Sequence, residues 1–255
     1  MSQMGALRRA AAAALLLAPT RAVAQLRPHD ARVWSAAAVA FVGAALADEP
    51  IRDELRGPGA PVWRITAHDV EPLGRAVVDL AGLGTSYVVA RLAHQPRWAR
   101  ATVHVAAGYL AADAVTAVLK PTVGRARPRA ELGPHDFRAF TTGDDRGSFP
   151  SGHATHAFAL AAGIAEEAHR PWVTAVAYGT AALVGWSRIH ADAHWASDVV
   201  AGAVVGTSAS LTTIDWLHRR DGAPAATPHD ARTTREPATW HVRVAPRVVR
   251  VTVRF

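Results

Sequence analysis

The stretch Ser187-Arg-Ile-His-Ala-Asp-Ala-His-Trp-Ala-Ser-Asp198 joins two apolar runs, 172–189 and 196–217. Both runs are longer than an ordinary strand and rich in residues that favour helix. The stretch therefore predicts the junction of two helices, with polar and charged side chains concentrated at one end of the pair.

Four further apolar runs precede this pair, at 33–47, 76–93, 101–119 and 153–168. Proline falls between the runs, where it does not interrupt helical hydrogen bonds. We therefore predict an all-α fold, a six-helix bundle. Residues 121–150 carry many glycines, prolines and charges, and they predict a long irregular loop of the kind that is often functional.

The two ends of the chain differ from this bundle. Residues 1–24 predict a signal peptide or an N-terminal anchor, because basic residues precede a short apolar run and a small-residue cleavage site. The helical domain is expected over 25–218 and a linker over 219–239. In 240–255 valine alternates with other residues, which predicts a short β-hairpin.

From the N-terminal segment we expect a protein of the cell envelope, with the bundle embedded in the membrane. Basic residues gather at alternate helix ends, as the positive-inside rule predicts for six spans. The mean hydropathy of +0.06 is low for six spans, so an exported soluble periplasmic protein is the alternative. If the N-terminal segment is retained in the cytoplasm, the long loop faces the periplasmic or external side.

Composition limits the chemistry. Half of the 255 residues are apolar, which suits one domain with a substantial core. The chain has no cysteine, which excludes disulfides, zinc–thiolate sites and cysteine nucleophiles. Its net charge of +7 suits a phosphate, an anionic lipid or a nucleic acid, and the sign alone does not choose among them.

Two cations frame the start of the long loop, in Lys120-Pro-Thr-Val-Gly-Arg-Ala-Arg127-Pro. Arginine presents a planar fork of donors that matches phosphate geometry, and lysine adds a compact point charge. Lys120 and Arg127 are therefore candidate phosphate-binding residues. We expect Arg125 and Arg129 to be surface charges.

The sequence Phe149-Pro-Ser-Gly-His153 stands directly before the fourth helix. Ser151 suits a helix N-cap, Gly152 lets the backbone approach an oxyanion, and the free amides of a helix N-terminus bind anions. We expect an anion-binding helix start here, with His153 beside the phosphate.

His194 and Asp198 in the opening stretch are four residues apart, so on a helix they share a face. The carboxylate can accept from one ring nitrogen while the other faces the substrate, which predicts a nucleophile and its partner. Arg188 supplies a third cation. A metal site from His190, Asp192 and His194 is the rival interpretation, but the cations nearby would repel a metal ion, and no metal or other cofactor is expected.

In order and spacing, the three motifs resemble the Lys-x6-Arg-Pro, Pro-Ser-Gly-His and Ser-Arg-x5-His-x3-Asp signatures of the type 2 phosphatidic acid phosphatase (PAP2) and vanadium haloperoxidase superfamily. The resemblance covers about 101–217, and the preceding helices match the six-helix layout of its lipid phosphatases.

The resemblance implies a role for each candidate. The phosphate-binding residues would be Lys120, Arg127, Ser151, Gly152 and Arg188. The catalytic residues would be His194 as the nucleophile, Asp198 as its partner and His153 as the general acid.

We therefore expect a metal-independent phosphatase that hydrolyses a lipid-linked phosphomonoester or diphosphate through a phosphohistidine. The expected partners are a phosphorylated lipid or small phosphate ester and the membrane, but no nucleic acid. Two alternatives stay open: a vanadate-dependent haloperoxidase and a non-catalytic anion-binding membrane protein. The motifs recognise the phosphate and not its leaving group, so they do not identify the substrate.

Overall fold

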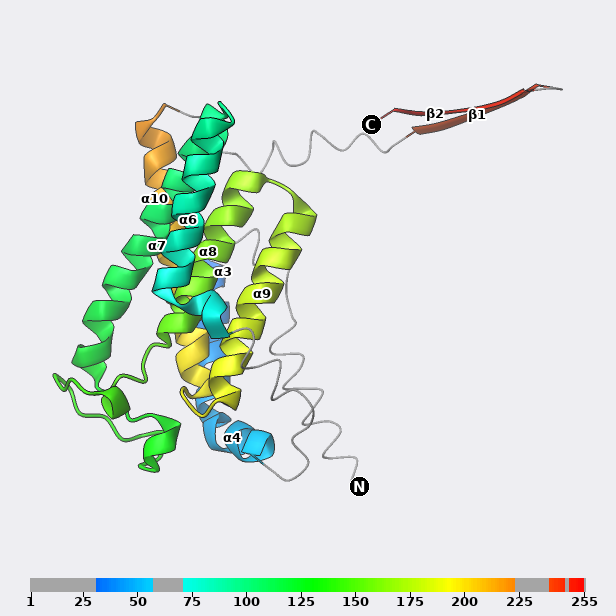
Figure 1. The fold of residues 1–255 in the computed structure, drawn as a ribbon. Helices are drawn as coiled ribbons and strands as arrows, with labels where there is room; N and C mark the ends of the chain where they lie inside the picture. The colour runs from blue at the N-terminus through cyan, green and yellow to red at the C-terminus, as the bar shows by residue number, and fades with distance from the viewer. Residues whose placement is uncertain (1–30, 57–70, 223–238, 246–247, 255) are drawn as a thin grey trace. The chain divides into compact units, whose positions relative to one another are not determined.

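The computed structural model describes residues 31–56, 71–222, 239–245 and 248–254 (Figure 1). The chain divides into two compact units, Met1–Trp216 and Leu217–Phe255. The signal peptide or anchor expected over 1–24 lies outside the described residues, as does most of the expected linker.

Among the described residues of the first unit, the regular structure is helical. The α-helices are α3 (Ala31–Leu46), α4 (Asp48–Arg56), α6 (Ala76–Leu92), α7 (Pro96–Val123), α8 (Gly152–Ala168), α9 (Pro171–His190) and α10 (Ala196–Arg220), the last of which ends in the second unit. Short 3-10 helices are η1 (Glu71–Gly74), η2 (Pro128–Ala130) and η3 (Asp144–Arg146). Each predicted apolar run corresponds to one helix, with at most one residue beyond its end, and the all-α fold class is confirmed.

Three details differ from the sequence prediction. The helix α4 was not predicted, because its sequence DEPIRDELR contains no apolar run. Its first turn carries Asp48 and Glu49, which suit the positive end of a helix dipole. The helix α7 continues through Pro121, so the long loop begins at Gly124. The helix α10 extends to Arg220, into the segment expected to be linker.

The second unit contains two antiparallel strands. Strand β1 (Thr239–Ala245) pairs with β2 (Val248–Arg254), and Thr239 lies opposite Arg254 in the register.

The bundle has small residues inside and large aliphatic residues outside. The helix α8 packs against α7 and α9, and α6 packs against α7 (Figure 1). The core around α8 consists largely of alanine, including Ala157 and Ala162. Val118 is 65% exposed and Val176 is 61% exposed. Small residues let membrane helices approach closely, while an aliphatic outer surface suits lipid.

Length and hydropathy mark some of these helices as candidate membrane spans. Among the described residues, α7 and α10 are each long and apolar enough to cross a membrane. The helices α3 and α4 are bent by 58° and would add a third span if they count as one.

The helix α10 approaches α8 closely because glycine stands where their backbones meet. A Cβ atom added at Gly202 would lie 2.6 Å from the carbonyl oxygen of Ser151, and one at Gly206 would lie 2.3 Å from that of Thr155. A larger residue at either position would push the helices apart. The glycines therefore hold the start of α8 beside the start of α10.

We expect Gly206→Ala to destabilise the protein by about 1–3 kcal/mol, because the added methyl group would overlap a backbone carbonyl that cannot move aside. Thermal unfolding of the detergent-solubilised protein measures the change. The control is Gly179→Ala on α9, where an added Cβ meets nothing within 4 Å. Alanine favours helix over glycine by about 1 kcal/mol, so this control should keep or raise the Tm. Equal changes in the two variants would contradict the packing argument.

Candidate active site

The three sequence motifs come together at one end of the bundle. In Figure 1, α4, the loop between α7 and α8 and the turn between α9 and α10 lie at the same end. A cavity of about 370 Å³ is found there. It is lined by Gly74, Arg75, Ala76, Lys120, Arg127, Gly152, His153, His156, Arg188, Ala193 and His194. All predicted site residues except Ser151 and Asp198 are in this set, and those two are fully buried.

Lys120 lies in the last turn of α7, which ends at Val123 and is capped by Gly124. Gly124 has φ 57° and ψ 40°, and an added Cβ would lie 1.8 Å from the carbonyl oxygen of Arg138. This left-handed conformation favours glycine and folds the loop back on itself. The ammonium of Lys120 then donates to the carbonyl oxygen of Gly147 at 2.7 Å, which holds it at the cavity.

Arg127 is fixed by backbone carbonyls from two segments. Its Nε donates to the carbonyl oxygen of Asp144 at 2.5 Å, and its Nη1 donates to that of Ala193 at 3.1 Å. The same Nη1 lies 3.4 Å from Nε2 of His194. Burial, and then the charge of Arg129, lowers the pKa of Arg127, but an arginine stays protonated in a protein. A fixed cation therefore stands beside the imidazole.

The start of α8 has the predicted N-cap. The Oγ of Ser151 accepts from the N–H of Ala154 at 3.4 Å, and the N–H of Ser151 donates to the carbonyl oxygen of Asp198 at 3.0 Å. The hydroxyl of Ser151 thus caps the helix, while Gly152 and His153 line the cavity.

The remaining cavity wall contains one predicted cation, Arg188, and two polar residues outside the motifs, Arg75 and His156. Arg188, near the end of α9, is 5% exposed. Arg75 stands at the start of α6, outside every motif, so no sequence signal pointed to it. His156 lies one turn after His153, and its Nε2 is 2.8 Å from Oδ1 of Asp113 on α7.

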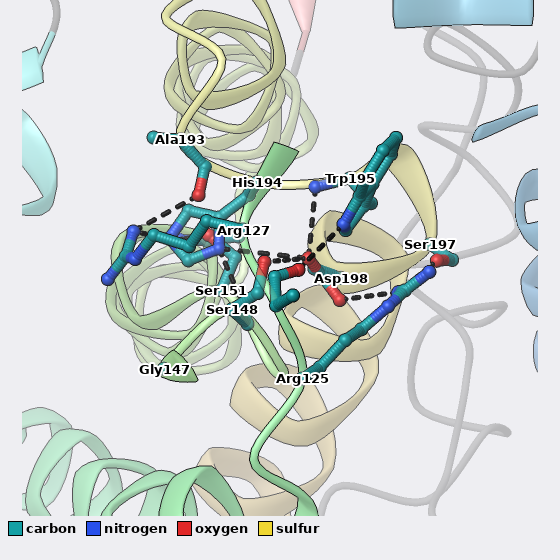
Figure 2. Close-up of polar contacts among 12 residues, drawn as sticks. Arg125, Arg127, Gly147, Ser148, Ser151, Ala193, His194, Trp195, Ser197 and Asp198 are labelled. Carbon is teal, nitrogen blue, oxygen red and sulfur yellow. Dashed lines mark hydrogen bonds and ion pairs between the residues drawn. The ribbon is translucent and has the colours of Figure 1, made fainter. Parts of the chain in front are cut away.

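His194 is buried, and its two ring nitrogens have different partners (Figure 2). Its Nδ1 lies 2.8 Å from the carbonyl oxygen of Ser148. Since a carbonyl oxygen can only accept, Nδ1 carries the proton and Nε2 has the free electron pair. Burial, followed by the charges of Lys120 and Arg127, holds the pKa of His194 well below its ordinary value. The ring is therefore neutral at pH 7.

The predicted direct contact between Asp198 and His194 is not a hydrogen bond, because Oδ2 of Asp198 lies 3.9 Å from Nδ1 of His194. That oxygen accepts from the hydroxyl of Ser148 at 2.5 Å and from the N–H of Trp195 at 2.9 Å. The helix α10 begins at Ala196, so His194 precedes it and the helical spacing does not apply. Ser148 therefore links the carboxylate to the imidazole (Figure 2).

The expectation that Arg125 is a surface charge is wrong. It is 3% exposed, and its guanidinium donates to Asp198 at 2.7 Å and to Asp48 at 2.8 Å. The sequence could not pair Arg125 with Asp48, which lies 77 positions away on the unpredicted α4. Arg129 does lie at the surface, where it pairs with Asp144 at 2.6 Å.

The residues of the rival metal site have other partners. The ring of His190 stacks on Trp186 with 5.2 Å between centroids, and Asp192 pairs with Arg52 at 2.7 Å. Within the part of the chain that the structure describes, His190, Asp192 and His194 do not gather their ligand atoms around one point.

Sequence comparison identifies relatives of this chain. Residues 101–221 match the sequence model of the PAP2 superfamily. A lipid A 1-phosphatase of Porphyromonas gingivalis is 32% identical over 161 residues, which are 62% of this chain and 32% of that protein. A lipid A 1-phosphatase of Rhizobium johnstonii is 38% identical over 98 residues, 38% of this chain and 39% of that protein. The chain thus spans well under half the length of either relative.

Solved structures share the fold. LpxE of Aquifex aeolicus has a TM-score of 0.53 and 18% identity, covering 66% of this chain and 94% of that one. The PAP2-type phosphatidylglycerolphosphate phosphatase of Bacillus subtilis has a TM-score of 0.57 and 19% identity, covering 73% and 96%. The motifs, the matched segment and the fold agree, and residues 101–221 of this chain are those similar to the PAP2 superfamily.

Proposed function

We propose that this protein is a phosphatase that hydrolyses a lipid-linked phosphomonoester or diphosphate through a phosphohistidine at His194. One observation carries the proposal: a buried imidazole, held as a single tautomer by Ser148, presents its unprotonated Nε2 3.4 Å from Arg127 in a cavity lined by cations. A neutral imidazole with a free electron pair beside an anion-binding pocket is suited to attack phosphorus.

In the proposed reaction, Nε2 of His194 attacks the phosphorus atom. An N–P bond forms as the P–O bond to the leaving group breaks, and His153 donates a proton to the departing oxygen. Water then attacks the phosphohistidine, giving up a proton to His153. The N–P bond breaks, inorganic phosphate leaves, and His194 regains its electron pair.

Lys120, Arg127 and Arg188 would hold the phosphoryl oxygens. All three line the cavity, so they stand where negative charge develops in the transition state and need little rearrangement. Gly152 lines the same cavity at the start of α8, where backbone amides favour an anion. Ser151 would contribute by capping this helix start.

A lipid substrate is supported by two independent observations. The bundle exposes large aliphatic side chains along its helices, and the two curated relatives are named lipid A 1-phosphatases. We infer that the cavity opens on the periplasmic or external side. The connections α6–α7 and α8–α9 lie at the opposite end of the bundle (Figure 1). Arg97 and Arg100 lie in the first turns of α7 and Arg170 directly precedes α9, and basic residues at this end favour the cytoplasmic side.

A panel of substrates in detergent micelles tests the activity: phosphatidate, phosphatidylglycerophosphate, a polyprenyl diphosphate, lipid A and a soluble monoester. We expect release of inorganic phosphate from at least one lipid, faster than from the soluble ester, and persistence in excess chelator. Loss of activity to chelator that a divalent cation restores would contradict the metal-free mechanism.

Arg127→Gln should lower the rate of phosphate release by about a hundredfold or more, because it removes a preorganised donor.

The two histidines should respond differently to the leaving group. His194→Ala should abolish turnover on every substrate and prevent trapping of an acid-labile phosphoenzyme, because attack is always required. His153→Ala should lose far more rate on an alkyl phosphate than on nitrophenyl phosphate, whose leaving group is stable as an anion. Rates on both esters measure the difference. Equal losses in His153→Ala would show that it is not the general acid.

Impermeant maleimide labelling of single cysteines tests the orientation cleanly, because the chain has no cysteine. Phe140→Cys places the label in the long loop, at a position that is 84% exposed. Arg170→Cys is the matched control at the opposite end. We expect Phe140→Cys to react in spheroplasts with an intact inner membrane, and Arg170→Cys to react only after that membrane is opened. The reverse pattern would overturn the proposed orientation.

A further inference from the structure

Three buried charged side chains lie directly behind the proposed nucleophile. Arg125 donates from Nη1 to Oδ1 of Asp198 at 2.7 Å and from Nη2 to Oδ2 of Asp48 at 2.8 Å. None of the three is more than 3% exposed. We call this group the Asp48–Arg125–Asp198 array.

The array is tightly hydrogen-bonded. Ser197 joins its two halves, since its hydroxyl accepts from Arg125 at 2.7 Å and donates to Asp48 at 2.6 Å. The N–H of Ser197 donates to Oδ1 of Asp48 at 2.9 Å, and Nε of Arg125 donates to the carbonyl oxygen of Pro134 at 2.9 Å. Buried charges with this many partners hold one geometry.

The net charge of the array affects how easily His194 becomes cationic. Burial raises the pKa of Asp198, but both of its oxygens accept hydrogen bonds, as an ionised carboxylate does. With both carboxylates ionised beside one guanidinium, the array has a net charge of −1, whereas Asp198 and Arg125 alone would cancel. Asp48 therefore restores the negative charge that an imidazole needs nearby when attack on phosphorus makes it cationic. The nearest carboxylate oxygen lies 3.9 Å from Nδ1 of His194.

The array also reaches the imidazole through Ser148. The hydroxyl of Ser148 donates to Asp198 at 2.5 Å, and its carbonyl oxygen accepts from Nδ1 of His194 at 2.8 Å. Because Ser148 also donates its N–H to the carbonyl oxygen of Arg125 at 3.1 Å, the arginine fixes Ser148 from a second direction. The orientation and tautomer of His194 thus depend on the array.

We propose that Asp48 and Arg125 are positioning residues for His194, and that the net negative charge of their array with Asp198 stabilises the cationic phosphohistidine. This inference rests on the proposed function. Asp48 belongs to α4, outside the 101–221 segment that matches the superfamily. The N-terminal part of the chain therefore completes the site, although Asp48 does not line the cavity.

The first test replaces Asp48 with its neutral isostere. Asp48→Asn should lower kcat about ten- to a hundredfold, as removal of an orienting carboxylate does elsewhere, while KM stays within about twofold. The matched control is Asp53→Asn, an exposed position on the same helix, which should keep the wild-type kcat. A kcat for Asp48→Asn within about twofold of this control would overturn the proposal.

The pH profile distinguishes loss of charge from a loosened site. The acid limb of kcat/KM, corrected for substrate titration, reports the pKa of His194 in the free enzyme. Loss of a negative charge disfavours the imidazolium, so in Asp48→Asn the limb should move to lower pH. Loosening would let water reach the ring and raise its pKa towards the ordinary value. A limb that moves to higher pH would therefore show a merely structural role.

Histidine titration by NMR reads the same shift without turnover, with the His194 signal assigned by His194→Gln. Absence of phosphatase activity in the wild type would then contradict the proposed function. An unshifted His194 pKa in Asp48→Asn would contradict the role proposed for the array.

If Asp48→Asn does not fold, Ser148→Ala tests the link to His194, because it removes the hydroxyl and keeps the carbonyl. We expect kcat to fall at least about fivefold with KM unchanged, since the charge-assisted hydrogen bond is lost. A wild-type kcat in a folded Ser148→Ala variant would also overturn the proposal.

Discussion

The guanidinium of Arg125, buried between two carboxylates, constrains the arrangement of the whole polar end of this molecule. Removing an ion from water costs several kcal/mol, and a buried charge persists only with close partners. Asp48 comes from α4, Arg125 from the loop after α7 and Asp198 from α10. These three segments must therefore meet wherever Arg125 is buried, and the cavity forms beside their meeting point.

Close helix packing makes this meeting possible. Gly202 and Gly206 let α10 approach the backbone of α8, and alanine fills much of the core around α8. The same distribution leaves large aliphatic residues on the outside, where a lipid environment accepts them. The small residues of the core thus bring together the helices whose ends carry the polar site.

The proposed nucleophile stands between opposite charges. Lys120 and Arg127 line the cavity, and together with burial they hold the pKa of His194 down, which keeps Nε2 unprotonated. The carboxylate of Asp198 lies on the other side, 3.9 Å from Nδ1. Cations that favour a phosphate and disfavour an imidazolium would, without this carboxylate, also disfavour the phosphohistidine. Opposite charges on the two sides would thus suit both the neutral imidazole and the proposed cationic phosphohistidine.

The helices and most of the residues of the candidate site could be predicted from the sequence, because they depend on residues that are close together in the chain. Apolar runs with proline between them indicated the helices, and the spacing within three short motifs indicated six of the residues that line the cavity. The motif His194-x3-Asp198 also indicated a nucleophile and a carboxylate in the same place. Its detail was wrong, because His194 precedes α10 and the carbonyl of Ser148 takes the expected position of the carboxylate.

Only the tertiary structure decided which charges are paired. Arg125 and Arg129 look alike in sequence, yet one is buried against Asp48 and Asp198 and the other lies at the surface with Asp144. A short charged helix such as α4 has no apolar periodicity, so no local sequence pattern predicts it. The physical reason is that burial of a charge depends on partners far away in the chain, whereas helix formation and motif spacing depend on neighbours.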